Sequence, residues 1–94
     1  MEDALHRIQV WASHGTMKQF SAEVIAKLSK AGMEAELNGD TLTCYKVERK
    51  GGLFGKKERR PVLSIIRKGN EVTIPRESAD PEFVEQLAIL LKQH

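Results

Sequence analysis

The middle of the chain alternates apolar and polar residues at period two, and this pattern constrains the fold more than any other feature. Such alternation is typical of strands with one buried face. Asn38-Gly39 and Gly69-Asn70 interrupt it where two-residue hairpins need positive φ angles. We therefore predict an antiparallel meander with strands over residues 33–37, 40–49, 59–68 and 71–75.

Two helices are predicted to flank this meander. Thr16 and Gln19 have the spacing of a capping box, and the apolar residues after them recur every three or four positions as far as Gly32. The run 80–82, Asp-Pro-Glu, is a strong helix start because it supplies a capping side chain, a preset φ and a negative charge at the positive end of the helix dipole. The stripe that follows it is Phe83, Leu87, Leu90 and Leu91.

The first segment is predicted to be a strand, because His6, Ile8, Val10 and Ala12 alternate with Arg7, Gln9 and Trp11. The element order is then β-α-β-β-β-β-α. This predicts an α+β fold of two layers, a mostly antiparallel sheet with two helices packed on one face. The other face stays partly open, and we expect Trp11, together with Thr43 and Tyr45, to point toward it.

Length and cysteine content indicate a small intracellular domain. The 94 residues fit one α+β domain spanning 1–94. The single cysteine, Cys44, excludes an intramolecular disulfide and is expected to fill core space. The N-terminus is acidic where a signal peptide would be basic, and no apolar run approaches the roughly 20 residues that span a bilayer. We expect a cytoplasmic protein.

Charge is concentrated in one stretch. The chain holds 15 basic and 13 acidic residues, yet residues 46–60 carry seven cations against two carboxylates. The cations are Lys46, Arg49, Lys50, Lys56, Lys57, Arg59 and Arg60. Because glycines occupy positions 51, 52 and 55, we expect a flexible basic hairpin loop at about 49–59. The seven cations are the candidate nucleic-acid or anion-binding residues.

Three interpretations of this basic loop are open. Its cations could contact the backbone phosphates of RNA or DNA and release counterions. Alternatively, they keep a hairpin tip solvated and discourage edge pairing. The apolar pair Leu53-Phe54 favours a functional loop, since a solubilising tip would be polar; Phe54 and Trp11 are therefore candidates for stacking or anchoring. The same composition would also suit a shallow contact with an anionic membrane.

The chain resembles three known families, one in a short motif and two in the order of their elements. The run 52–55, Gly-Leu-Phe-Gly, resembles the GXXG loop of KH-type nucleic-acid-binding domains, although in that family the loop joins two helices and here predicted strands flank it. The order helix, three strands, helix is similar to double-stranded-RNA-binding domains and to HicA-type toxins. The last helix begins with acidic residues where the RNA-binding family has lysines, and no histidine lies between His14 and His94 where the toxin family has one. These resemblances imply no site residues.

Motifs for catalysis are absent from the sequence. None of the three histidines has an acid or nucleophile partner at motif spacing, and there is no dinucleotide fingerprint or metal-ligand cluster. We predict a non-catalytic binding domain without a cofactor, which contacts nucleic acid through the loop 46–60. The alternative is a protein-interaction or regulatory subunit whose loop or open sheet face docks an acidic partner or forms a homodimer.

Overall fold

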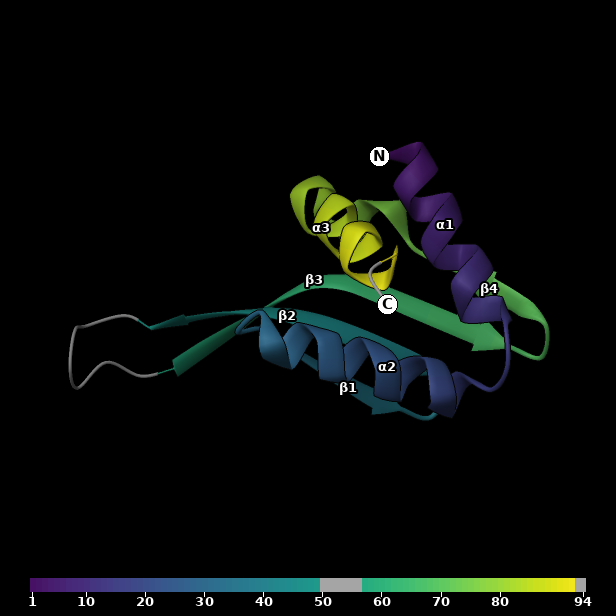
Figure 1. Cartoon of the computed structure of the whole chain (residues 1–94), viewed down its shortest axis with the longest axis horizontal. Helices are drawn as coiled ribbons and strands as arrows, with labels where there is room; N and C mark the ends of the chain where they lie inside the picture. The colour runs from purple at the N-terminus through teal and green to yellow at the C-terminus, as the bar shows by residue number, and fades with distance from the viewer. Residues whose placement is uncertain (50–56, 93–94) are drawn as a thin grey trace.

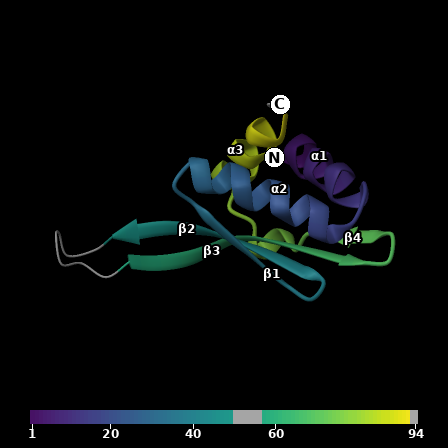
Figure 2. The ribbon, with the colours of Figure 1, turned by 60° about the horizontal axis from the view of Figure 1, so that its bottom comes forward.

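The computed structural model describes residues 1–49 and 57–92. Their elements are α1 (Glu2–Ser13), α2 (Met17–Lys30), β1 (Glu34–Asn38), β2 (Thr41–Arg49), β3 (Lys57–Lys68), β4 (Glu71–Thr73), the short 3-10 helix η2 (Arg76–Ser78) and α3 (Pro81–Lys92). The strands form an antiparallel sheet in the order β1-β2-β3-β4, and α1, α2 and α3 cover the same face of it (Figures 1 and 2). The predicted α+β class and the meander are confirmed.

The first segment is a helix, so the predicted strand over residues 6–12 is wrong. The residues that α1 buries recur at helical intervals and are Ala4, Leu5, Ile8 and Ala12. The alternating pattern fails at Val10, which is 43% exposed. Within residues 1–49 and 57–92, the helix layer therefore holds three helices in place of the predicted two. Arg7, Gln9 and Trp11 accordingly lie on α1 and not on the open face of the sheet.

Local signals fixed the other helices as predicted. Thr16 Oγ1 accepts a hydrogen bond from the Gln19 backbone N–H at 3.0 Å, and Gln19 Oε1 accepts one from the Thr16 N–H at the same distance. This is the predicted capping box, and Gly32 follows the end of α2 with a φ of 77°. Gly39 also has a positive φ, 59°, and it begins the first hairpin loop one residue later than predicted, because Asn38 still belongs to β1.

The core lies between the sheet and the helix layer. Its largest fully buried side chains are Ile8, Leu28, Leu42, Leu63, Ile65, Phe83, Leu87 and Leu91. They come from α1, α2, α3 and the two central strands, so each helix is held by its own apolar stripe. Full burial of one such side chain contributes about 1.5–3 kcal/mol.

The strands β2 and β3 continue together past the rest of the sheet. Within the described residues, β1 pairs with β2 only as far as Tyr45, and β4 pairs with β3 only from Ile66 onward. Residues 46–49 and 57–60 therefore pair only with each other. We call this two-stranded ribbon the arm. It extends beyond the helices on the left of Figure 1.

A β-bulge marks the base of the arm. Cys44 pairs with Leu63 but the next residue, Tyr45, pairs with Pro61, which leaves Val62 as the extra residue. Proline cannot donate to a ladder, and a bulge is one of the places in a sheet that tolerates it. The Val62 carbonyl oxygen accepts a hydrogen bond from the Asp80 backbone N–H at 2.9 Å. The bulge thereby connects the start of α3 to the base of the arm.

Candidate nucleic-acid interface

The arm carries cations on both of its faces. Side chains alternate along a strand, so Lys46 and its cross-strand partner Arg60 lie on the same face as the helices. Lys57 and Arg59 lie on the opposite, open face, together with Tyr45. The structure thus separates four of the predicted cations into two pairs, each of which contacts carboxylates from a different element.

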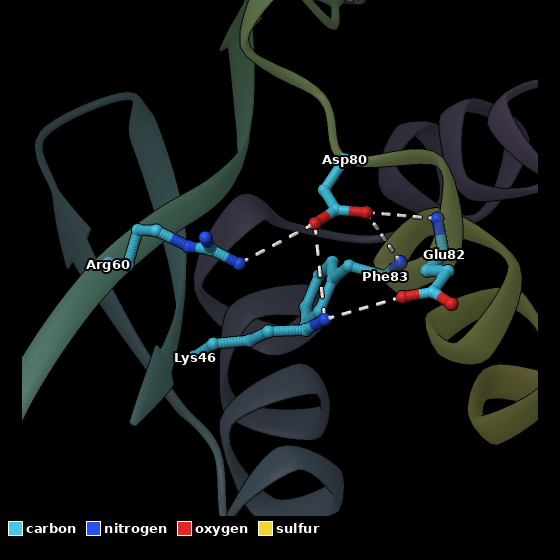
Figure 3. Close-up of polar contacts among 5 residues, drawn as sticks. All are labelled: Lys46, Arg60, Asp80, Glu82 and Phe83. Atoms are coloured by element: carbon cyan, nitrogen blue, oxygen red, sulfur yellow. Dashed lines mark hydrogen bonds and ion pairs between the residues drawn. The ribbon is translucent and has the colours of Figure 1, made fainter. Parts of the chain in front are cut away.

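On the helix side, the first pair surrounds the start of α3 (Figure 3). One carboxylate oxygen of Asp80, Oδ1, caps the helix by accepting from the Glu82 and Phe83 N–H groups at 3.0 and 3.4 Å. The other, Oδ2, lies 3.9 Å from both Lys46 Nζ and Arg60 Nη2. Lys46 Nζ is also 3.9 Å from Glu82 Oε2. Asp80 therefore serves at once as the predicted helix cap and as the counterion of the arm.

On the open face, the second pair contacts β1. Lys57 forms an ion pair with Glu34, and Arg59 Nη1 lies 3.6 Å from Glu34 and 3.7 Å from Glu36. The Arg59 guanidinium also stacks over the Tyr45 ring, 4.3 Å from its centroid. Tyr45 is thus on the open face, as expected, and it orients an arginine there.

The carboxylates partly neutralise the positive charge of the arm, but the cationic side chains remain exposed to solvent. The hydrogen bond from Lys57 holds the pKa of Glu34 below its ordinary value, so Glu34 stays ionised beside the two cations at neutral pH. The side chains of Arg60, Lys57 and Arg59 remain 62%, 55% and 44% exposed, whereas Lys46 is only 26% exposed. Ion pairs this exposed typically contribute 0 to about 1 kcal/mol, so a competing anion can displace them.

Of the remaining predicted loop residues, only Arg49 lies within the described part of the chain. Arg49 belongs to β2, where it pairs in register with Lys57, and Lys57 and Arg59 belong to β3, so both strands reach into the predicted loop 49–59. Lys50, Phe54 and Lys56 lie outside the described residues.

Trp11 and the arm are at opposite ends of the molecule. The C-terminal end of α1 contacts the other end of β3, where Arg67 Nη1 donates to the carbonyl oxygens of Ala12 and Gly15 at 3.0 and 2.9 Å. Seven residues of strand separate Arg67 from Arg60, which corresponds to roughly 23 Å. The structure therefore places Trp11 far from the described part of the arm.

Sequence reasoning missed a groove on the outer side of α1. It has a volume of about 350 Å³ and is lined by His6, Arg7, Val10, Trp11, His14 and Lys92. Arg7, Trp11 and His14 are spaced four and three residues apart, which places them on one side of a helix. This spacing was visible in the sequence, but the strand interpretation placed Arg7 and Trp11 on the open face of a sheet and His6 and Val10 on the opposite face.

The described residues show no metal-binding cluster. They contain no cluster of three or more histidine, cysteine or acidic side chains that could hold a metal ion. Cys44 is fully buried, and desolvation raises the pKa of its thiol to about 12, which confirms the prediction that it fills the core. No helix among residues 1–49 and 57–92 is long and apolar enough to cross a bilayer.

Comparison with known proteins returns no match: no family model, no curated protein and no solved structure is similar to the chain.

Proposed function

We propose that this protein is a non-catalytic nucleic-acid-binding domain that contacts phosphates through the arm, in the reducing cytoplasmic environment expected from its sequence. The observation that supports this proposal is the ribbon itself, in which residues 46–49 and 57–60, among the residues that the structure describes, pair only with each other and extend past the helix layer with cations on both faces. A two-stranded antiparallel ribbon fits the major groove of B-form DNA. Cations on its two faces would then contact the phosphates of both groove walls.

The ion pairs of the arm are compatible with this role. Phosphate would replace Glu34, Glu36 and Asp80 as the partner of Lys57, Arg59 and Arg60, so the exchange keeps each cation paired. The ion pairs of Arg59 and Arg60 that phosphate would replace are exposed and 3.6–3.9 Å long. Because exposed pairs of this kind stabilise the fold little, their exchange costs little. The carboxylates then act as a built-in competitor that weakens non-specific binding.

The test is fluorescence anisotropy of labelled duplex DNA, duplex RNA and single strands at two salt concentrations, with the wild type and a triple variant, Lys57→Ser, Arg59→Ser and Arg60→Ser. We expect the tightest binding to duplex DNA, since the major groove of A-form RNA is too narrow for side chains to read. The triple variant should lower the slope of log K against log salt by roughly 2 to 3.

A matched control distinguishes a specific effect of the arm cations from a general effect of net charge. The side chains of Lys18, Lys30 and Lys68 are exposed, lie outside the arm and make no ion pair or hydrogen bond within the described residues. Changing these three to Ser removes the same charge and should leave most of the affinity intact. Equal losses in the two triple variants would contradict a specific role for the arm.

A second variant tests the competitor role of the carboxylates. Glu34→Gln with Glu36→Gln releases Lys57 and Arg59 from their partners, so affinity for duplex DNA should rise about three- to tenfold. Glu71→Gln with Glu77→Gln makes the same change in net charge at exposed positions outside the arm that form no ion pair with its described cations, and should raise affinity less. If no nucleic acid binds at low salt, the proposal fails, and an acidic protein partner becomes the better hypothesis for the arm.

A further inference from the structure

The groove beside α1 is distinct from the arm in position and chemistry. α1 and α3 pack side by side (Figures 1 and 2). Lys92 at the end of α3 lines a groove whose other described lining residues come from α1 and the residue after it. Its apolar surface comes from Val10 and from Trp11, which is half-buried and packs against the core. Because Trp11 is anchored in this way, its ring presents a fixed aromatic surface and loses little entropy on contact with a ligand.

The charged side chains that line this groove are cations, while the adjoining groove that Arg7 and Lys92 also line contains Asp3 and Glu85. Arg7 and Lys92 line the groove beside α1 together with His6 and His14, and no carboxylate is among its described lining residues. Unlike the cations of the arm, the side chains of Arg7 and Lys92 make no ion pair or hydrogen bond within residues 1–49 and 57–92. The groove therefore offers unpaired donors to an anion beside an aromatic ring.

We propose that the groove binds a small ligand in which a planar aromatic ring is joined to a carboxylate or phosphate. The ring would stack on Trp11 and contact Val10, and the anionic group would be held by Arg7 and Lys92. A volume of about 350 Å³ matches the low end of the range of small-molecule sites, enough for one ring system with its acidic group. The arginine provides a fork of donors that suits both acidic groups, while the lysine acts as a point charge.

The single tryptophan of the chain makes the site directly observable, because Trp11 gives the only indole N–H signal in a ¹⁵N-correlated NMR spectrum. The probes are adenosine 5′-monophosphate and 2-naphthoate, compared with adenosine and inorganic phosphate. We expect saturable shifts of the Trp11 signal with one or both aromatic anions, at dissociation constants of about 0.1–1 mM. Adenosine, which lacks the anion, and inorganic phosphate, which lacks the ring, should bind at least about tenfold more weakly. The two aromatic anions show whether phosphate or carboxylate is preferred.

Three variants test the assignment of residues. Arg7→Gln and Lys92→Gln should each weaken binding about three- to tenfold, whereas Lys30→Gln, which removes a cation at the far end of α2, should not. The triple serine variant of the arm should bind the probes like the wild type, so this result is independent of nucleic-acid binding. Absence of a saturable shift up to about 10 mM, equal binding of adenosine, or no effect of Arg7→Gln and Lys92→Gln would overturn the proposal.

Discussion

The part of β2 and β3 that lies under the helices, which we call the covered half, and the arm belong to the same two strands. Different interactions stabilise them. Under the helices, the inward side chains of β2 and β3, Leu42, Cys44, Leu63 and Ile65, are at most 1% exposed. In the arm, the corresponding positions are charged, and two of them, Lys46 and Arg60, form ion pairs at the surface. The change occurs at the Val62 bulge, where the chain leaves the helix layer.

If the arm binds nucleic acid as proposed, this difference separates the residues that stabilise the fold from the residues that bind, along one hairpin. Each buried apolar side chain contributes about 1.5–3 kcal/mol, whereas an exposed ion pair contributes 0 to about 1 kcal/mol. The covered half therefore determines whether the protein folds. Substitutions in the arm cost little stability and would instead change the affinity for the proposed partner. If the comparison is right, substitutions in the two halves will affect different measurements.

The largest expected effect is on the chemistry of Cys44. Because its thiol has a pKa of about 12 in place of 9.0, the thiolate at pH 8 is about a thousandfold scarcer than in the unfolded chain. Iodoacetamide should modify the native protein at least that much more slowly than the protein in urea, as followed by mass spectrometry. Rapid modification under native conditions would show that the covered half opens readily.

The next effect is on folding stability. Phe83 is completely buried at the start of α3, and Phe83→Ala should lower the free energy of unfolding by about 3–5 kcal/mol. The triple serine variant of the arm should change it by no more than about 1 kcal/mol. Equilibrium urea denaturation measures both. A loss in the arm variant comparable with that of Phe83→Ala would contradict the separation of roles.

Asp80 stands where the two halves meet, and two substitutions distinguish its functions. Asp80→Ala removes both the cap of α3 and the counterion of Lys46 and Arg60, and should cost about 1–2 kcal/mol. Asp80→Asn keeps a capping oxygen and loses only the charge, so it should cost much less. The same urea titrations compare them. Equal costs would mean that the charge of Asp80, and not its cap, stabilises this end of the helix.

The sequence revealed features that depend on neighbouring residues and missed those that depend on distant ones. The capping box at Thr16 and the helix start at Asp80 were predictable because the groups that bond are three residues or fewer apart. α1 was misread because Ile8 and Ala12, four residues apart, satisfy both a period of two and a period of 3.6. Leu5, which is buried, and Val10, which is exposed, decide in favour of the helix.

The partners of the arm could not be predicted for a related reason. The basic stretch was evident from composition, but Lys46 and Asp80 are far apart in sequence, and their contact depends on the bulge that ties Val62 to the start of α3. Likewise, the contact of Arg59 with Glu34 requires the register of three strands. Pattern alone could therefore place the cations on one hairpin but could not show that carboxylates accompany them.

A smaller effect is expected inside the helix layer. Ser21 is 1% exposed, and its hydroxyl has no hydrogen-bond partner within the described residues. Ser21→Ala removes a buried hydroxyl that is not compensated by a hydrogen bond, and alanine has a higher helix propensity than serine. The substitution should therefore stabilise the protein by about 0.5–1.5 kcal/mol. Urea denaturation at neutral pH measures this gain. Destabilisation would instead indicate a hydrogen bond to Ser21 in solution.

The smallest effect concerns the exposed pair of Lys57 and Glu34. Since the pKa of Glu34 is lower in the folded protein, the pair stabilises the fold above the ordinary pKa of a glutamate, and this contribution is lost as the pH falls through the lowered value. Lys57→Gln should move the pKa of Glu34 upward toward its ordinary value, as measured by NMR titration of its side-chain carboxyl carbon. Lys68→Gln, on the same strand at its other end, is the control and should leave that pKa unchanged.

Because both partners are exposed, Lys57→Gln should change the free energy of unfolding in urea very little, although the same substitution should clearly weaken DNA binding. A variant with a clear loss of stability and unchanged DNA affinity would reverse the assignment of Lys57 from binding to folding.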